Sequence, residues 1–237
     1  MIIIIIIIII IIMAQLFCEL GSAIIDGKKA PEKSMLYMAS VQNENGQHVC
    51  GGFLVSNNFV VTAAHCDVVL GTHDLSRVEK TVKYIEKICQ HPSYNSNIRE
   101  NDILLLKVGG MDNTFYKGQP IQLPTSEINI NEKCSVAGWG NTECNIVGEL
   151  RVVDVSIINR DVCKKEWSNL PVNVICAGKG LYISCSQGDL GGPLVCDGTA
   201  VGVASFYKNK DCDTPNVYTD ISKSLTWINK VLKQNDC

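Results

Sequence analysis

The sequence has no excess of basic residues. Its 237 residues contain 21 Lys and Arg against 24 Asp and Glu, which gives a formal net charge of −3. A protein that binds nucleic acid or a polyanionic membrane surface needs a basic stripe or patch. The charge balance therefore argues against nucleic acid as a partner and against a polybasic membrane-binding segment.

The sequence also lacks any Cys-x-x-Cys pair, although it contains 12 cysteines. That spacing is typical of zinc ribbons, and Cys89 with His91 offers too few ligands for a metal site. No metal and no cofactor are expected. Twelve cysteines exceed what a reducing cytosol leaves unpaired, so the composition predicts disulfide bonds and an extracellular protein.

No Pro/Ser-rich linker, charge block or internal repeat is present from Ile24 onward. With 46% hydrophobic and 19% charged residues, the chain has enough apolar sequence to bury a sizeable core. We therefore expect one globular domain of the larger sort or two small ones.

The N-terminus carries an uninterrupted apolar run. Residues Ile2–Ile12 are all isoleucine, and no Lys or Arg precedes Lys28. The run is too short to span a bilayer comfortably, so no stable membrane anchor is expected, but it has the length of a signal-peptide core. The usual basic segment before that core is missing.

The small residues Gly21–Ala23 allow signal cleavage before Ile24. The sequence thus predicts a signal peptide over residues 1–23 and a mature domain over residues 24–237. The alternative is a translated low-complexity repeat with the true start at Met13.

Short stretches rich in Val, Ile, Leu and Tyr recur between turn residues along the mature chain, which is typical of an antiparallel all-β protein. These stretches are Val49–Val55, Thr81–Ile88, Ile103–Val108, Leu150–Ile158 and Ala200–Phe206. Near the end, apolar residues recur at helical spacing, at Ile221, Leu225, Ile228 and Leu232. The pattern predicts a C-terminal helix with one buried face, and Asn159 is a plausible N-cap for a second short helix over Arg160–Trp167.

Three motifs follow one another along the chain: Thr62-Ala63-Ala64-His65-Cys66, then Asn101-Asp102-Ile103, then Gly188-Asp189-Leu190-Gly191-Gly192-Pro193. In this order they resemble the trypsin-like serine protease family, in which His, Asp and Ser appear in that sequence. The granzyme and mast-cell-protease branch is most similar, partly through Leu150–Val155. The resemblance implies two packed antiparallel six-stranded β-barrels, a site in the cleft between them, and the C-terminal helix.

The resemblance also implies a role for each residue of the site. His65 stands at the position of the general base, and Asp102 at that of the buried carboxylate that orients it. The backbone N–H groups of Gly188 and Leu190 would form the oxyanion hole, and Asp189 would pair with the ammonium group of Ile24. The substrate pocket falls on Ser184 (or Ile183 at its floor), Ser205, Phe206, Tyr207 and Asn216.

The sequence departs from the family where its nucleophilic serine is expected, because residue 190 is leucine. Leucine has neither a hydroxyl nor a thiol, so the acyl-enzyme route is closed. Ser184 and Ser186 lie six and four residues earlier and do not replace the nucleophile. The pocket floor is not acidic, and Tyr207 and Asn216 replace glycines that commonly line this pocket, so it is narrowed or blocked.

Two functions remain open. The first is a secreted trypsin-fold pseudoprotease that binds a protein or peptide ligand, or acts in defence, without hydrolysing peptide bonds. The second is an active chymotrypsin-like or granzyme-like endopeptidase, if residue 190 of the native protein is serine. In both cases we expect an extracellular protein, with granule storage as a further alternative, although the acidic balance lacks the basic charge that suits storage on proteoglycan.

The resemblance implies four disulfide bonds: Cys50–Cys66, Cys134–Cys196, Cys163–Cys176 and Cys185–Cys212. With Cys18 in the signal peptide, an odd number of cysteines remains, namely Cys89, Cys144 and Cys237. We expect Cys89 to pair with Cys237 and Cys144 to stay exposed. The protein is then a monomer, or a dimer linked through the unpaired cysteine.

The N-terminus of the secreted protein tests the cleavage site. N-terminal sequencing is expected to begin at Ile24, because Ser22 and Ala23 place small residues before that bond. A mature chain that begins at Ser22 would contradict this assignment.

Overall fold

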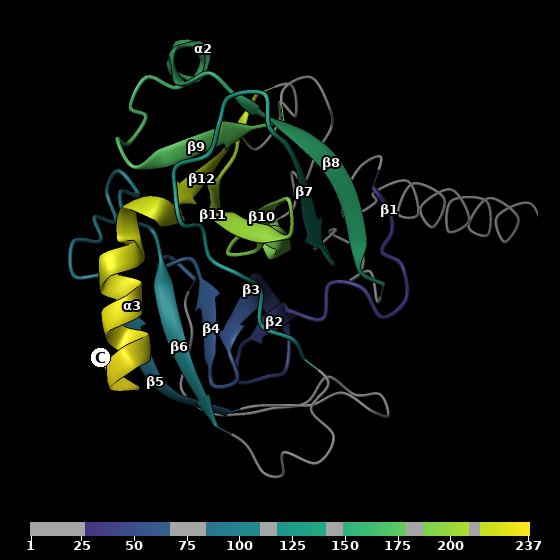
Figure 1. Ribbon diagram of the computed structural model, residues 1–237, viewed down its shortest axis with the longest axis vertical. Coiled ribbons are helices and arrows are strands. Elements are labelled where there is room, and N and C mark those ends of the chain that lie inside the picture. The colour runs from purple at the N-terminus through teal and green to yellow at the C-terminus, as the bar shows by residue number, and fades with distance from the viewer. Residues whose placement is uncertain (1–26, 67–83, 110–117, 141–148, 179–186, 209–213) are drawn as a thin grey trace, which may run out of the picture.

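Two antiparallel sheets packed against each other form the body of the protein (Figure 1). The computed structural model describes residues 27–66, 84–109, 118–140, 149–178, 187–208 and 214–237. None of the helices in these ranges is long and apolar enough to cross a membrane.

The N-terminal half of the chain forms a five-stranded sheet in the order β2-β3-β4-β6-β5. Its strands are β2 (Met38–Gln42), β3 (His48–Ser56), β4 (Phe59–Thr62), β5 (Tyr84–Gln90) and β6 (Leu104–Gly109). The resemblance implies six strands here, and residues 67–83, which precede β5, lie outside the described ranges. The described strands agree with the expected ones at β3, β5 and β6.

The C-terminal half, together with the short N-terminal strand β1, forms a seven-stranded sheet in the order β1-β8-β7-β10-β11-β12-β9. Its strands are β1 (Lys28–Lys29), β7 (Lys133–Gly138), β8 (Arg151–Ile158), β9 (Val174–Ala177), β10 (Pro193–Cys196), β11 (Thr199–Phe206) and β12 (Asn216–Asp220). β8 also pairs with β9, through Ile157 with Ala177 and Ile158 with Cys176. This pairing closes six of the strands into a barrel, so the predicted all-β fold is confirmed.

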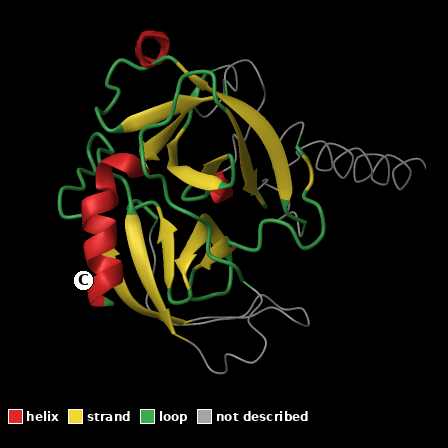
Figure 2. Ribbon diagram, viewed as in Figure 1, coloured by secondary structure: helices red, strands yellow, loops and turns green. Residues whose placement is uncertain are grey.

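The C-terminal helix α3 (Leu225–Gln234) follows a short 3₁₀ turn over Ile221–Ser224 and lies along the five-stranded sheet (Figure 2). Its buried residues Ile228 and Val231 belong to the same apolar cluster as Phe59 and Leu106 of that sheet. The apolar face that the sequence predicts is therefore the face that packs on the five-stranded sheet.

The second predicted helix is also present, as α2 (Arg160–Glu166). The side chain of Asn159 accepts a hydrogen bond of 2.7 Å from the backbone N–H of Asp161, which is the N-cap contact that the sequence predicts. The helix ends one residue earlier than expected, because Trp167 has extended backbone angles.

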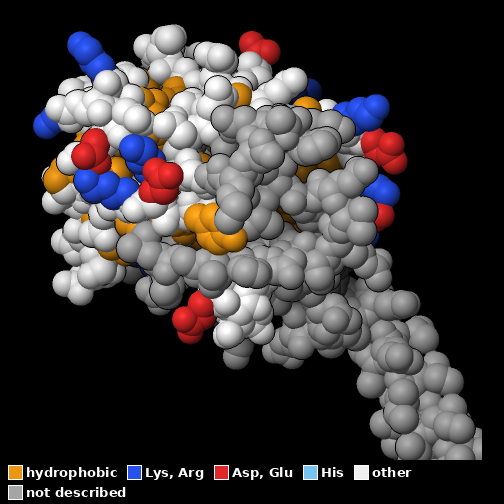
Figure 3. Space-filling view, turned by 90° about the horizontal axis from the view of Figure 1, so that it is seen from below, with side chains coloured by type: hydrophobic (Ala, Val, Ile, Leu, Met, Phe, Trp, Pro, Cys, Tyr) orange, Lys and Arg blue, Asp and Glu red, His pale blue; other side chains and the backbone are white. Residues whose placement is uncertain are grey.

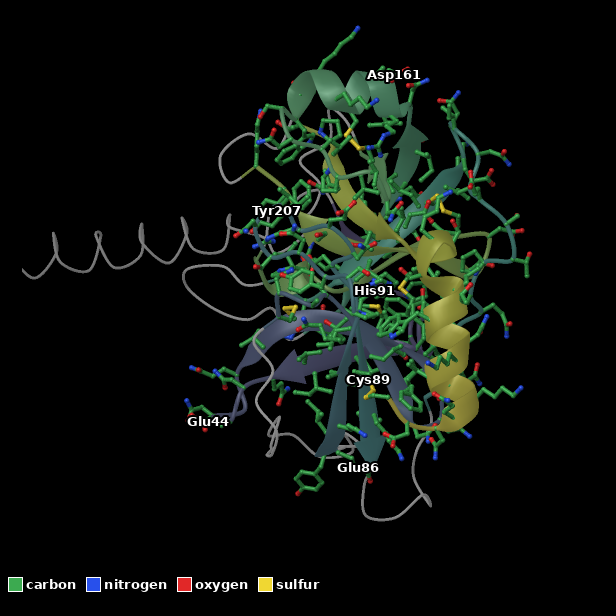
Figure 4. The ribbon with its side chains drawn as sticks, turned by 90° about the vertical axis from the view of Figure 1, so that its left-hand side faces the viewer. Glu44, Glu86, Cys89, His91, Asp161 and Tyr207 are labelled. Atoms are coloured by element: carbon green, nitrogen blue, oxygen red, sulfur yellow. A yellow bond between two sulfur atoms is a disulfide. The ribbon has the colours of Figure 1, made fainter. Side chains whose placement is uncertain are left out.

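Four disulfide bonds join described residues: Cys50–Cys66, Cys89–Cys237, Cys134–Cys196 and Cys163–Cys176. These pairings are the expected ones, including the Cys89–Cys237 bond between β5 and the end of α3. Figure 4 shows Cys89 close to that helix. Cys18, Cys144, Cys185 and Cys212 lie outside the described residues, as do the predicted signal peptide and Ile24.

The surface carries charges of both signs. On the face shown in Figure 3, the described Lys and Arg side chains lie beside Asp and Glu side chains, and neither sign forms a broad patch of its own. This distribution is consistent with the balanced composition of the chain.

The Cys89–Cys237 bond joins residues 148 apart and is expected to fix the end of α3 to the sheet. Replacing both cysteines by alanine should lower the free energy of unfolding by about 2–4 kcal/mol, because the unfolded chain regains conformational freedom. Chemical denaturation under non-reducing conditions measures this change.

The Lys87→Ala variant is a matched control, since Lys87 forms an exposed ion pair of 2.5 Å with Asp236 beside the same disulfide. This variant should unfold almost as the wild type does. An equal loss of stability in the two variants would show that the disulfide is not what fixes the helix end.

Candidate active site

The centre of the candidate site is the carboxylate of Asp102, which lies just before β6 and has no exposed surface. Its Oδ1 accepts a hydrogen bond of 2.9 Å from the backbone N–H of His65, and its Oδ2 lies 2.7 Å from Nδ1 of the same histidine. His65 follows β4 and is held there by the neighbouring Cys50–Cys66 disulfide. The structure therefore brings together the two residues that the sequence predicts for the base and its orienting carboxylate.

The other sheet supplies two further hydrogen bonds to Asp102. The Ser205 hydroxyl of β11 donates to Oδ2 at 2.5 Å, and the Thr219 hydroxyl of β12 donates to the backbone carbonyl at 3.0 Å. Both hydroxyl-bearing residues are fully buried. The buried carboxylate is thus satisfied by donors from both halves of the molecule, which burial of a charge requires.

These contacts fix the tautomer of His65. A carboxylate only accepts hydrogen bonds, so Nδ1 carries the proton and Nε2 of the neutral ring presents a lone pair. Nε2 is buried and has no hydrogen-bond partner among the described residues. The ring is oriented as a general base, but the geometry offers no described hydroxyl from which it could take a proton.

Residue 190 directly follows a short 3₁₀ helix, η2 (Gln187–Asp189), and lies beside Gly51 of β3. The Leu190 carbonyl accepts a hydrogen bond of 2.8 Å from the backbone N–H of Gly51. The leucine side chain is half-buried and packs against the apolar cluster that includes Ala63 and Cys66, on either side of His65 in sequence. Leucine therefore has an apolar neighbourhood at this position.

The loop around Leu190 needs glycine at residue 191. Gly191 has φ +84°, and a Cβ there would lie 2.3 Å from Oγ1 of Thr62 and 2.5 Å from the Gly51 carbonyl. Only glycine allows both this backbone angle and this approach. The loop backbone is therefore fixed against β3 and β4 whatever side chain stands at residue 190.

His48, to which the sequence analysis assigns no role, supports the same loop. Its Nε2 lies 2.7 Å from the carbonyl of Gly188, and its Nδ1 lies 2.7 Å from the Ser40 hydroxyl. Because the carbonyl only accepts, Nε2 carries the proton and Ser40 donates to Nδ1. The ring also packs edge-to-face on Trp139, at 5.7 Å between centroids.

Asp189, the predicted partner of the Ile24 ammonium group, is buried at the base of this loop. Its Oδ1 accepts a hydrogen bond of 2.8 Å from the backbone N–H of Gly140. A Cβ at Gly138 would lie 1.9 Å from the same oxygen, so only glycine leaves room for the carboxylate. Ile24 lies outside the described residues, so its pairing with Asp189 stays a prediction.

The predicted pocket residues gather at the ends of β11 and β12. Burial raises the pKa of the Tyr207 phenol, Asp189 raises it further and Arg99 lowers it, so this hydroxyl lies within electrostatic reach of both charges. Figure 4 shows Tyr207 on the side of the molecule opposite α3. Asn216 is buried and hydrogen-bonds the phenol of Tyr218, whose pKa burial raises. Ser184 and Ile183 lie outside the described residues.

The aromatic wall beside the pocket is Phe206, whose ring meets that of Trp167 edge-to-face at 5.0 Å. Trp167 in turn donates a hydrogen bond of 3.0 Å to the carbonyl of Pro215, and Lys208 lies over its ring. Among the described residues, no group of three or more His, Cys, Asp or Glu side chains is placed to hold a metal ion.

Comparison with known proteins identifies the family. The family model for trypsin matches residues 24–228. The chain therefore belongs to the trypsin family of serine proteases.

Individual relatives include proteases of the predicted branch. Duodenase-1 of Bos taurus is 39% identical over 226 residues, which cover 89% of this chain and 90% of the relative. Granzyme B of Rattus norvegicus is 36% identical over 231 residues, covering 90% and 92% of the two chains. The similarity to granzymes and mast cell proteases that the sequence predicts is confirmed.

Solved structures show the same fold. Neuropsin, a serine protease expressed in mouse brain, superposes with a TM-score of 0.79 at 29% identity, covering 88% of this chain and all of that one. A structure of GrC superposes with a TM-score of 0.77 at 32% identity, covering 89% of this chain and all of that one.

Two residues of the site carry no recognisable signal in the sequence. His48 reaches Gly188 across 140 positions, and Arg99 donates a hydrogen bond of 2.7 Å to the Ser205 carbonyl across 106 positions. Neither side chain belongs to a periodic pattern or to one of the three motifs. Only the packing of the two sheets reveals their contacts.

The burial of His48 predicts a pH effect on stability. Burial lowers the pKa of His48 below its ordinary value of 6.5, although its contact with Gly188 partly offsets this. The unfolded chain then binds a proton that the folded chain does not, so the free energy of unfolding falls as the pH drops below about 6.5. A histidine-ring NMR titration should place the pKa of His48 below 6.5.

The matched comparison is between His48→Gln and His91→Gln, because burial lowers the pKa of His91 as well. Each variant should reduce the loss of stability between about pH 7 and pH 5, measured by denaturation at each pH. A His48 that titrates at or above its ordinary value would contradict the account of this contact.

Proposed function

We propose that the protein is a secreted member of the trypsin family that binds a protein or peptide ligand in its cleft and does not hydrolyse peptide bonds. The observation that carries the proposal is leucine at residue 190, in the Gly-Asp-Leu-Gly-Gly motif where the family has its nucleophile. A side chain without oxygen or sulfur cannot form the acyl-enzyme. Loss of the nucleophile alone lowers kcat by about 10⁶-fold in subtilisin.

The surviving His65–Asp102 pair does not contradict this proposal. Asp102 is a fully buried carboxylate, and removing one of its donors would leave a buried charge with an unmade hydrogen bond. The His65–Asp102 pair thus stabilises the fold, independently of any role in catalysis. On this account His65 is an oriented imidazole that has no proton to accept from residue 190.

The pocket supports a changed ligand preference. Tyr207 and Asn216 bring large side chains to positions that the family resemblance assigns to glycine, and the Asn216 side chain is held by Tyr218. A narrowed pocket without an acidic floor does not favour the Lys or Arg side chain that trypsin takes. The ligand is therefore held mainly outside this pocket, along the surface of the cleft.

The disulfides support an extracellular location. Four disulfide bonds among the described residues require an oxidising compartment to form and persist. With the predicted signal peptide, this favours secretion, with storage in granules as the alternative. A role in defence is in keeping with the similarity to granzymes and mast cell proteases.

A second candidate function is that of an active serine endopeptidase, for a native protein with serine at residue 190. The observation that favours it is the intact set of hydrogen bonds among His65, Asp102 and Ser205. In that case Nε2 of His65 would receive the serine proton and act as the general base.

The Leu190→Ser variant separates these functions. Wild-type protein should neither react with a fluorophosphonate probe nor cleave a peptide substrate mixture, because it has no nucleophile. The Leu190→Ser variant should become labelled and should cleave peptides about 10³-fold faster or more, since His65 is already oriented.

Two controls complete this test. Leu190→Ala should stay inactive, because it removes the leucine side chain without adding a hydroxyl, and Leu190→Ser with His65→Ala should lose the gained activity. Cleavage by the wild type that disappears on His65→Ala would overturn the non-hydrolytic function.

A further inference from the structure

The segment that precedes Asp102 holds an arginine against β11. Arg99 and Asn101 both have φ +52°, which non-glycine residues adopt only where neighbouring contacts compensate for the strain. Asn101 supplies those contacts: its Nδ2 donates to the Ser93 carbonyl at 3.0 Å, and its Oδ1 accepts from Asn173 at 3.1 Å. Asn101 thus fixes the backbone of the segment to the half of the molecule with the five-stranded sheet and to the half with the seven-stranded sheet.

The side chain of Arg99 ends on the backbone of β11. Its Nη1 donates a hydrogen bond of 2.7 Å to the carbonyl of Ser205, the residue whose hydroxyl holds Asp102. At this point the pairing of β11 with β12 shifts register between Ala204 and Phe206, and Ser205 has no partner in the ladder. A backbone acceptor beside His65 is therefore occupied by a side chain, which an incoming backbone N–H can replace.

Arg99 also lacks a counter-ion in the described part of the chain. It is half-buried, and its hydrogen bond is to a neutral carbonyl. The carboxylate of Asp102 is already engaged by His65 and Ser205, and none of the ion pairs between described residues includes Arg99. Glu100 follows it in the chain, and its backbone carbonyl accepts a hydrogen bond from Asn95.

Charged residues also lie near the end of β11, where Arg99 binds. Tyr207 lies within electrostatic reach of Arg99 and of the buried Asp189, and Lys208 follows as an exposed second cation. A half-buried guanidinium group that no described carboxylate pairs with attracts an anion. The guanidinium group offers five N–H donors, and the described contacts use one of its nitrogens.

We propose that the cleft selects peptides that carry an acidic side chain, and that Arg99 is the residue that selects them. In the free protein Arg99 caps the Ser205 carbonyl. When a peptide N–H takes that carbonyl, the guanidinium group turns to the carboxylate of the same peptide and binds it through two parallel hydrogen bonds. This inference rests on the proposed peptide-binding function and names its ligand class.

The physical reason for selection is the fate of the displaced arginine. A peptide without an acidic side chain takes the Ser205 carbonyl but leaves the half-buried guanidinium group without an acceptor, which costs binding free energy. An acidic peptide replaces the lost hydrogen bond by stronger, charge-assisted ones. The preference is therefore expected to be about tenfold to a hundredfold in Kd, the scale of one hydrogen bond to a charged group.

The test uses pairs of fluorescent hexapeptide pools, one pair for each scanned position. Both pools of a pair are random elsewhere, and the scanned position is Glu in one pool and Gln in the other. Binding of both pools to the disulfide-intact protein is measured by fluorescence anisotropy for the wild type, Arg99→Ala and Lys208→Ala. Lys208 is the matched control, since it is an exposed cation whose described contact is with the ring of Trp167. Circular dichroism verifies that each variant is folded.

We expect the wild type to bind the Glu pool about tenfold or more tightly than the Gln pool at one scanned position. The preference should disappear in Arg99→Ala and persist in Lys208→Ala. Equal binding of the two pools by the wild type, or a Glu preference that survives in Arg99→Ala, overturns the role of Arg99 and leaves the peptide-binding function standing. Binding of neither pool by any of the three proteins overturns the peptide-binding function, and the role of Arg99 with it.

Discussion

The buried carboxylate of Asp102 is the contact on which the arrangement of the two sheets at the cleft depends. It accepts hydrogen bonds from the backbone and ring of His65, on the five-stranded sheet, and from Ser205, on the seven-stranded one. Thr219 adds a bond to its backbone carbonyl. A carboxylate without exposed surface must keep such donors, because each hydrogen bond to a buried charge contributes about 1.5–3 kcal/mol.

If the protein is non-hydrolytic, as proposed, this constraint explains why the His–Asp pair is kept without a nucleophile. The pair contributes to the packing of the fold, whereas residue 190 contributes to the fold through its backbone. The carbonyl of Leu190 binds Gly51, and Gly191 sits against Thr62 and Gly51 where no Cβ fits. A leucine side chain can therefore occupy the position without moving the loop, and it gains apolar contacts there.

The sequence predicts most of the fold because its signals are local or covalent. The apolar spacing of Ile221 to Leu232 identifies the C-terminal helix, and Asn159 identifies the start of α2. The Cys89–Cys237 bond is a hypothesis about the cysteines that the resemblance leaves over, and it is confirmed. The motifs around His65 and Asp102 identify the buried pair. The sixth strand that the resemblance implies for the first sheet and the pairing of Ile24 with Asp189 fall outside the described residues and stay predictions.

Other features could not be predicted, because they arise only when the sheets pack. His48 has no motif, yet its ring supports the carbonyl of Gly188. Arg99 lies in a polar turn that reads as a solvated loop, yet two residues with positive φ direct its side chain onto β11. Contacts of this kind join one side chain to one distant carbonyl, so neither composition nor periodicity carries any trace of them.

The proposed non-hydrolytic function depends most on the identity of residue 190 in the native protein. Mass spectrometry of the tryptic peptide that spans residues 180–208, prepared from the natural source, reads this residue directly. We predict leucine, which leaves His65 and Asp102 as an oriented pair in a non-hydrolytic cleft. Serine at this position would contradict the account, because the same hydrogen bonds would then complete a protease site.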